Sequence, residues 1–475
     1  MSDLISSTLV PLIYLLSAVL FILGLKRLGR VRTARSGNTI ASTAMLLAVL
    51  GTLLDMGQVD YRFIIAGVIL GGLVGGIAAV KVEMTSMPEM VALFNGFGGA
   101  ASALVALAVV WQELVETGSV DSAASVIGGS QAVTVGLSIL IGALTLSGSL
   151  IAFLKLQGKL KRGQPIMLPG RHVINALLGI GAVVLVGQFA YQTGGGAEQP
   201  ALMLTLVSLA LGVLLVIPIG GADMPVVVSL LNSYSGMAAS ATGFVLGNNL
   251  LIISGALVGA SGLILTQIMC VAMNRSLLNV LVGGFGEDGG GGGGDEEYSN
   301  VTSCGAEEAA MLLETAESVV VVPGYGLAVA QAQHAVREMA DLLIARGCKV
   351  TYAIHPVAGR MPGHMNVLLA EADVPYEQLL EMDVINPEFK STDVSIVLGA
   401  NDVVNPAALS DKSSPIYGMP ILNVHDSRSV FVVKRSLSPG YAGIKNTLFE
   451  HDNTTMIFGD AKKVLQDVIN ELKSL

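Results

Sequence analysis

The stretch Pro323-Gly324-Tyr325-Gly326-Leu327-Ala328-Val329 follows four consecutive valines and leads into residues that favour a helix. A strand, a Gly-X-Gly turn and a helix in this order form a dinucleotide-binding turn, whose glycines allow a tight bend and a close approach to a pyrophosphate. The helix amino terminus adds N–H groups and the positive end of its dipole. Val329 stands where Gly or Ala is usual, which weakens the match. We expect Gly324, Tyr325, Gly326 and Val329 to contact a nucleotide.

Around this turn, residues 300–475 alternate short β-branched runs with helical patterns, which predicts a Rossmann-like α/β domain with a doubly wound parallel sheet. The predicted strands are residues 318–322, 349–354, 394–398, 420–424, 430–433 and 455–458. The predicted helices are residues 327–346, 365–372, 376–382, 404–409 and 460–473.

Ligands in such sheets bind beyond the carboxyl ends of the strands, so the loops there are candidate binding segments. The expected contacts are Val357, Ala358, Gly359, Arg360, Met361, Pro362 and Gly363, then Gly399, Ala400, Asn401 and Asp402, and then Gly440, Tyr441 and Ala442. The predicted second strand ends in Ala-Ile-His-Pro at residues 353–356, without the carboxylate that usually receives the ribose of NAD. That leaves room for a 2′-phosphate.

Two basic groups suit such a phosphate. Lys434, Arg435 and Ser436 end a predicted strand and offer cationic and hydroxyl donors, and Arg360 lies in another of the loops. The alternative for each group is a solvated surface charge.

The first 285 residues have a different character. Of the whole chain, 52% is hydrophobic and 13% charged, against roughly 25% charged in soluble domains. Nine apolar stretches have about the 20 residues that cross a bilayer, which predicts a polytopic α-helical membrane domain with nine transmembrane helices. The stretches are residues 5–25, 38–55, 62–80, 88–111, 130–154, 172–191, 200–220, 225–247 and 250–272. The Gly-Tyr-Gly of a potassium filter is a weak alternative for residues 324–326, because they lie outside every stretch.

Charge predicts the orientation. Residues 1–285 hold 13 Lys and Arg against 10 Asp and Glu, and only Arg62 of these basic residues falls between spans on the side opposite the others. Basic loops stay in the cytoplasm, so we expect an inner-membrane protein with its amino terminus outside and its C-terminal domain cytoplasmic. Residues 286–475 hold 13 basic and 26 acidic residues, which argues against a nucleic-acid partner.

Glycines recur every four residues at 67, 71 and 75, at 72 and 76, and at 255 and 259. Such spacing lets helices pack closely, and a second interpretation is that it lets one helix slide against another. The glycine-rich run at residues 286–299 predicts a flexible linker between a membrane domain, residues 1–285, and a soluble domain, residues 300–475. The three cysteines are too scattered for a zinc site, and we expect no metal.

Polar groups inside a membrane are costly and usually functional. Asn95, Asn232 and Asp223 are the candidates for a proton path. The alternatives are interhelical hydrogen bonds for the two asparagines and simple solvation for Asp223.

Several motifs together resemble one family. They include Leu-Asn-Ser-Tyr-Ser-Gly at residues 231–236, His-Pro-Val-Ala-Gly-Arg at 355–360 and Gly-Ala-Asn-Asp at 399–402, together with residues 224–228, 273–276, 323–326 and 434–436. In this order they resemble the beta subunit of the proton-translocating nicotinamide nucleotide transhydrogenase family, from the first span to near the carboxyl end.

The resemblance implies a chain that binds NADP(H) and supplies much of the membrane domain. A partner alpha subunit, of one chain or two, would bind NAD(H). Two such alpha–beta assemblies would form a dimer. It implies that Lys434, Arg435 and Ser436 hold the 2′-phosphate, that residues 440–442 close over the cofactor, and that Asp402 lies near the nicotinamide and matters for coupling. Hydride would pass directly between cofactors without a catalytic residue.

One position departs from the family pattern. Many members have a histidine in the fourth span, where this chain has Asn95, so a histidine relay at that site is excluded. The proton donor would lie on a partner helix, or water held by Asn95 and Asn232 would suffice. A different class remains as the alternative: an ion channel or transporter whose cytoplasmic domain senses a nucleotide.

Overall fold

The computed structural model describes residues 9–29, 31–55, 61–115, 123, 127–160, 165–191, 197–282 and 298–475, except residues 362, 415 and 441. Within this range the chain forms two compact units. One comprises Met1–Pro218 with Val227–Leu265, and the other comprises Ile219–Val226 with Thr266–Leu475. The predicted linker lies outside the described residues, apart from residues 298 and 299.

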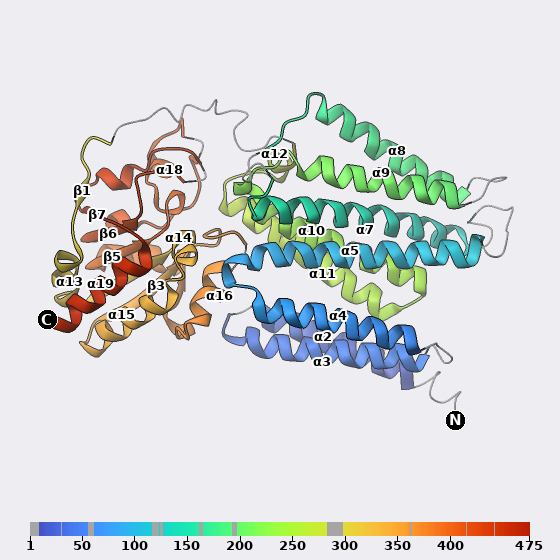
Figure 1. Cartoon of the computed structure of the whole chain (residues 1–475), viewed down its shortest axis with the longest axis horizontal. Coiled ribbons are helices and arrows are strands. Elements are labelled where there is room, and N and C mark those ends of the chain that lie inside the picture. The colour runs from blue at the N-terminus through green and yellow to red at the C-terminus, as the bar shows by residue number, and fades with distance from the viewer. Residues whose placement is uncertain are drawn as a thin grey trace. The chain divides into compact units, whose positions relative to one another are not determined.

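Long helices make up the first part of the described chain (Figure 1). They are α2 (Val10–Leu28), α3 (Val31–Asp55), α4 (Tyr61–Lys81), α5 (Met87–Val109), α7 (Gly129–Leu156), α8 (Arg171–Tyr191), α9 (Glu198–Val216), α10 (Met224–Leu246) and α11 (Asn249–Ala272). A π-helical turn, η3 (Val110–Val115), extends α5, and the short α12 (Leu277–Val282) follows α11.

Eight of these helices are long and apolar enough to cross a membrane. The remaining predicted span, residues 225–247, corresponds to α10, a helix of 23 residues in the predicted place. Its apolar character is interrupted by Asn232, Ser233, Tyr234 and Ser235, and it is not among the eight. The polytopic helical fold is confirmed, while the count of nine spans stays a prediction.

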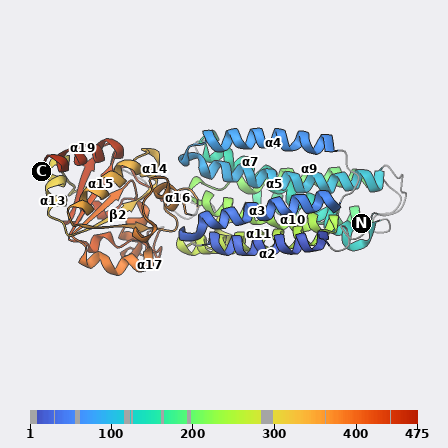
Figure 2. The ribbon, with the colours of Figure 1, turned by 90° about the horizontal axis from the view of Figure 1, so that it is seen from below.

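Small residues bring several helices into backbone contact. A Cβ on Gly142 of α7 would lie 2.5 Å from the carbonyl oxygen of Gly99 on α5, and a Cβ on Gly236 of α10 would lie 2.4 Å from the backbone nitrogen of Gly259 on α11. Helices α5 and α7 run side by side in both views (Figures 1 and 2). The packing interpretation therefore holds for Gly255 and Gly259.

The glycines of α4 behave differently. A Cβ added at residues 67, 71, 72, 75 or 76 would meet nothing within 4 Å, and none of the α4 residues is buried. These five glycines therefore make no close contact within the described part of this chain, and for them the packing interpretation stays a prediction.

The C-terminal part of the chain contains a sheet of seven parallel strands in the order β1-β7-β6-β5-β2-β3-β4. The strands are β1 (Thr302–Ser303), β2 (Ser318–Pro323), β3 (Lys349–Ile354), β4 (Leu379–Glu381), β5 (Val394–Leu398), β6 (Ser429–Lys434) and β7 (Thr454–Phe458). Leaving out the edge strand β1, this is the usual six-strand doubly wound order. The order in which successive strands are added to the sheet reverses between β2 and β5. Folds of this kind bind ligands at such a switch point.

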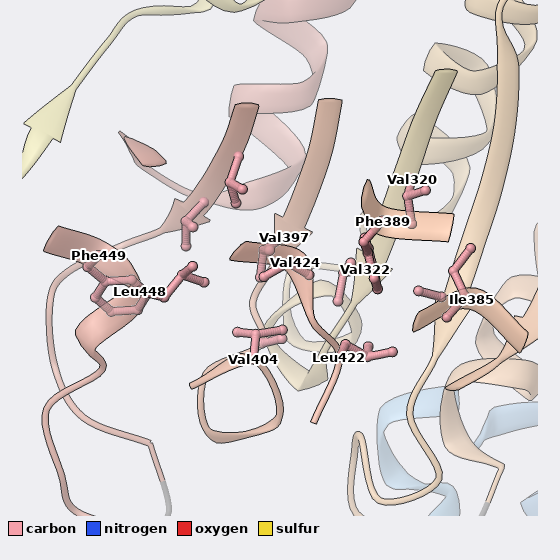
Figure 3. Close-up of a cluster of buried hydrophobic side chains, with 14 of the residues drawn as sticks. Val320, Val322, Ile385, Phe389, Val397, Val404, Leu422, Val424, Leu448 and Phe449 are labelled. Carbon is pink, nitrogen blue, oxygen red and sulfur yellow. The ribbon is translucent and has the colours of Figure 1, made fainter. Parts of the chain in front are cut away.

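Helices cover both faces of the sheet. Helices α13 (Ala306–Glu314), α15 (Gln333–Ala345) and α19 (Ala461–Ser474) pack together on one side, and α17 (Met382–Ile385) lies on the other (Figure 2). The central strands are buried on both faces, as the unbroken valine run of β2 requires. On one face Val320, Val322 and Val397 pack with Phe389 and Phe449 (Figure 3).

Four predicted elements differ from the structure. The run at 420–424 forms no strand: Ile421 and Leu422 are buried in the core, and the side chain of Asn386 bonds the carbonyl of Ile421 and the N–H of Asn423 in place of a neighbouring strand. Residues 376–382 hold the edge strand β4 because Leu379 pairs with Tyr352.

The single helix predicted over 327–346 is two helices. The five-residue α14 (Tyr325–Val329) ends before Gln331, whose φ of 48° is left-handed, and α15 starts at Gln333. Of the helix predicted over 404–409, only α18 (Ala407–Ser410) is an α-helix, because η8 (Asp402–Val404) is 3-10.

Candidate functional site

A cavity of about 420 Å³ lies at the carboxyl ends of β2, β5, β6 and β7. Its volume is within the usual range for small-molecule sites, and it includes the switch point between β2 and β5. Fifteen of the predicted contacts line it: Gly324, Tyr325, Gly326, Val329, Val357, Ala358, Gly359, Gly399, Ala400, Asn401, Asp402, Lys434, Arg435, Ser436 and Gly440.

The other predicted contacts divide into two groups. Arg360, Met361, Gly363 and Ala442 are described but do not line the cavity. Pro362 and Tyr441 lie outside the described residues. The structure thus gathers segments that are separated by more than a hundred residues in sequence into one wall.

The sequence interpretation missed Gly459, Asp460 and Ala461, which also line the cavity. They directly follow β7, so the same end-of-strand argument applies to them. Asp460 is the N-cap of α19, and its Oδ1 accepts from the N–H groups of Lys462 and Lys463. An aspartate just before an amphipathic helix was the available signal.

The turn requires glycine because it packs closely against the loop that follows the neighbouring strand β5. A Cβ on Gly324 would lie 2.4 Å from the nitrogen of Ala400, and a Cβ on Gly326 would lie 2.6 Å from the Cα of Gly399. The N–H of Gly324 donates to Leu398 O and that of Gly326 to Gly399 O. The turn is therefore fixed to the loop after β5, and these two N–H groups are already used within the protein.

Arg360 lies outside the cavity lining and contacts Tyr325, which lines it. Its guanidinium carbon is 4.3 Å from the centroid of the Tyr325 ring, a cation–π contact. His364, the first residue of α16 (His364–Glu371), accepts the backbone N–H of Arg360 at its Nδ1, and its ring lies 6.2 Å from that of Tyr325. The loop after β3 is thereby held against the glycine turn.

Lys434 ends β6 and holds the loop that follows it. Its Nζ donates to Ser438 O at 2.7 Å and lies 5.0 Å from the ring centroid of Phe449. Burial lowers the pKa of Lys434 to about 8, against the opposing effect of the Asp402 carboxylate. The Ser436 and Ser438 hydroxyls bond each other at 2.9 Å. The end of β6 therefore presents one lysine, one arginine and two hydroxyls to the cavity.

Asp402 fixes the 439–443 loop. Its Oδ2 accepts the N–H of Ala442 at 3.0 Å, and a Cβ on Gly440 would lie 2.5 Å from its Oδ1. Gly440 is thus required by the carboxylate beside it. Asp402 connects the loop after β5 to the loop after β6.

His355 positions the wall formed by Val357, Ala358 and Gly359. It is buried, its Nδ1 accepts the N–H of Val357 at 3.2 Å, and its Nε2 lies 2.9 Å from Pro420 O. An Nδ1 that accepts leaves Nε2 to carry the proton of a neutral ring. Burial lowers the pKa of His355 to about 4, although the hydrogen bond to Pro420 opposes this.

The three candidate polar groups of the membrane part have different surroundings. Asn95 is buried in α5 and its Nδ2 donates to Val228 O of α10 at 3.1 Å, which is the interhelical bond that was the alternative interpretation. Asn232 is half-buried in α10. The Asp223 carboxylate has no exposed surface and lies 3.6 Å from Arg275, so simple solvation is wrong for it.

Among the described residues, no group of three or more His, Cys, Asp and Glu side chains is arranged to hold a metal ion.

Comparison with known proteins gives a consistent result. Residues 10–471 match the model of a family described as the NAD(P) transhydrogenase beta subunit. The NAD(P) transhydrogenase subunit beta of Rhodospirillum rubrum is 50% identical over 461 residues, which cover 97% of this chain and 98% of the relative. The protein of the same name from a particular strain of that species gives the same values.

Proposed function

The chain belongs to the NAD(P) transhydrogenase beta-subunit family, and on this basis we propose that it is the NADP(H)-binding subunit of a membrane transhydrogenase. In this proposal an alpha subunit, of one chain or two, binds NAD(H), and the assembled enzyme couples hydride transfer to inward proton translocation. The observation that carries it is the cavity at the switch point, with Lys434, Arg435 and Ser436 at its edge. Family membership also favours this function over a nucleotide-sensing channel.

The cavity residues fit a phosphorylated dinucleotide. Arg435 and Ser436 follow β6 with the cationic and hydroxyl donors that suit a 2′-phosphate, and Arg360 stacks on Tyr325 close by. The end of β3 offers the neutral, buried His355 where an NAD site usually has a carboxylate. Because the turn N–H groups of Gly324 and Gly326 already have partners, side chains supply most of the contacts to phosphate.

The chemistry asks little of this chain's own acids and bases. A bound cofactor would supply hydride from its nicotinamide ring as NADPH or accept it there as NADP⁺, and direct transfer to a second nicotinamide needs no protein acid or base. The chain's residues instead bind and orient the cofactor and exclude water. Asp402 does this by holding the 439–443 loop at Ala442.

We place the proton path in the membrane part, with Asn95, Asn232 and Asp223 as its polar groups. If protonation there alters NADP(H) affinity, NADP(H) binding must alter protonation by the same factor. The soluble domain, residues 300–475, is cytoplasmic in this proposal, the amino terminus lies outside the inner membrane, and two alpha–beta assemblies form a dimer.

The first test is calorimetric titration of the full-length chain in detergent with NADPH, NADP⁺, NADH and NAD⁺. We expect binding of the NADP(H) pair and no detectable binding of the NAD(H) pair. Equal binding of all four nucleotides would contradict the proposal.

A matched pair of variants on β6 sharpens the test. Arg435→Gln removes a cation at the carboxyl end of the strand and should weaken NADPH binding by about tenfold to a hundredfold, the effect of a lost charge-assisted hydrogen bond. Arg428→Gln removes an exposed cation just before the strand, outside the cavity. It should leave NADPH affinity unchanged.

Coupling is tested in sealed vesicles that contain the chain with its alpha partner. A proton gradient directed toward the side of the membrane that carries the nucleotide-binding domain should accelerate the reduction of NADP⁺ by NADH. Ion flux without nucleotide turnover would support the channel alternative instead.

A further inference from the structure

Tyr298 and Ser299 join the beginning of the soluble domain to the segment that follows the 439–443 loop. The Tyr298 hydroxyl accepts the N–H of Asn446 at 3.1 Å, and its ring stacks on Phe449 with centroids 5.9 Å apart and an interplanar angle of 28°. Ser299 donates its N–H and its hydroxyl to Oε1 of Glu450, at 2.7 and 3.0 Å. Two successive residues thus bind one short segment by four contacts.

Lys445 completes this arrangement. Its Nζ lies 5.0 Å from the centroid of the Tyr298 ring and 2.9 Å from Oε2 of Glu450. The Lys445 and Glu450 side chains are both about one-fifth exposed, at 19% and 20%. The pKa of Glu450 is lowered, chiefly by the bond from Lys445 and further by the bonds from Ser299. The contact set is therefore charged, partly shielded and mutually satisfied.

Two arms lead from Tyr298 to the cavity, each through one intervening residue. In the first, the buried Asn446 donates its backbone N–H to the Tyr298 hydroxyl and its Nδ2 to Asn401 O, the latter at 3.1 Å. In the second, Phe449 contacts both the Tyr298 ring and Nζ of Lys434. Phe449 is fully buried at the edge of the hydrophobic core (Figure 3). Asn401 and Lys434 both line the cavity.

We propose that Tyr298 is a positioning residue for the nucleotide site: its hydroxyl fixes Asn401 through Asn446, and its ring fixes Lys434 through Phe449. This inference rests on the proposed function, because it takes the cavity to be the NADP(H) site. Tyr298 itself does not touch the cofactor, and its effect is on how firmly the site holds it. Residues 298 and 299, the first described residues after the predicted linker, thereby contact the residues that support the site.

The test compares NADPH dissociation rates from the full-length chain, measured by displacement with excess NADP⁺ in a stopped-flow fluorimeter. Tyr298→Phe removes the hydroxyl arm and keeps the ring, whereas Tyr298→Leu removes both arms. The control is Tyr376→Phe, which removes the hydroxyl of a tyrosine that is not part of this contact set. Thermal unfolding of each variant without nucleotide is recorded alongside.

We expect Tyr298→Phe to release NADPH about twofold to tenfold faster, the effect of one lost hydrogen bond. Its unfolding midpoint should match that of wild type, and Tyr298→Leu should be faster still. Tyr376→Phe should behave as wild type.

Two results would overturn the proposal separately. If wild type binds NADPH and Tyr298→Phe releases it at the wild-type rate, the positioning role is wrong and the proposed function stands. If wild type binds no NADP(H), the proposed function itself fails. Should Tyr298→Leu not fold, Tyr298→Phe still decides the matter, because it retains the ring packed on Phe449.

Discussion

Gly326 and Gly399 are in backbone contact across the switch point of the sheet. The N–H of Gly326 donates to Gly399 O at 3.0 Å, and a Cβ on Gly326 would lie 2.6 Å from the Gly399 Cα. Gly399 has a φ of 66°, which favours glycine there as well. Both residues line the cavity. The glycine turn is thus shaped by its neighbouring loop as much as by any ligand.

Gly326→Ala should lower the stability of the folded chain by about 1–3 kcal/mol, because the added methyl overlaps backbone that cannot rotate away. NADPH binding should weaken with it, since the cavity wall must shift. The measurement is thermal unfolding with and without NADPH. Gly305→Ala is the control, because a Cβ there meets nothing within 4 Å. Equal midpoints for the two variants would contradict the packing account.

NADPH affinity should decrease as the pH rises above about 8, because the pKa of Lys434 is about 8 in the free protein. A nearby phosphate favours the charged lysine, so binding takes up a proton above that pH. Calorimetry in two buffers of different ionisation enthalpy measures this uptake. Lys434→Arg keeps its charge throughout and should abolish both the decrease and the uptake. A flat affinity profile for wild type would show that Lys434 is remote from the phosphate.

Acidification should unfold the soluble domain in part through His355. Its folded-state pKa of about 4 lies below the unfolded value of 6.5, so the unfolded state binds more protons between them. The contribution of His355 to the free energy of unfolding is therefore constant above about pH 6.5. It decreases as the pH falls towards 4, by about 3 kcal/mol in all.

The measurement is thermal unfolding by circular dichroism across this pH range. His355→Gln should be less stable than wild type at neutral pH, and the difference should shrink on acidification. His334→Gln, which alters an exposed histidine on α15, should parallel wild type at every pH. A constant difference for His355→Gln would rule out this source of acid sensitivity.

Gly236→Ala should destabilise the membrane part by about 1–3 kcal/mol, because its Cβ would lie 2.4 Å from the backbone nitrogen of Gly259. Gly71→Ala on α4 should be tolerated, since a Cβ there meets nothing within 4 Å. Thermal unfolding in detergent compares the two. Equal loss in both variants would mean that α10 and α11 do not pack as described.

Asn232→Leu should slow the forward and reverse coupled reactions by at least about tenfold, because it removes an amide that holds water in the proposed proton path. The measurement is the initial rate in sealed vesicles with the alpha partner present. Thr205→Val is the control, because the Thr205 hydroxyl bonds Ala201 O within its own helix. Unchanged rates for Asn232→Leu would refute its role.

Much of the architecture follows from local sequence. Apolar runs of spanning length became helices because the backbone hydrogen bonds of a bilayer-crossing segment can only be satisfied within it. Five of the strands around the glycine turn begin and end within a residue of their predicted positions, since β-branched runs buried between helices favour the strand conformation. The end-of-strand argument then located most of the cavity wall, because all parallel strands end at the same edge.

Other features depend on contacts between distant segments and have no local signal. Residues 420–424 have the composition of a strand, yet the side chain of Asn386 bonds the Ile421 carbonyl and the Asn423 N–H. Only the fold therefore decides their conformation. Tertiary packing also decides that Asp223 is buried beside Arg275, and that Tyr298 reaches Asn446 over 148 positions of sequence. Sequence determines which segments can form helices, strands and turns, because those preferences are local. The partners of each side chain are decided only when the chain folds, because they come from residues far apart along it.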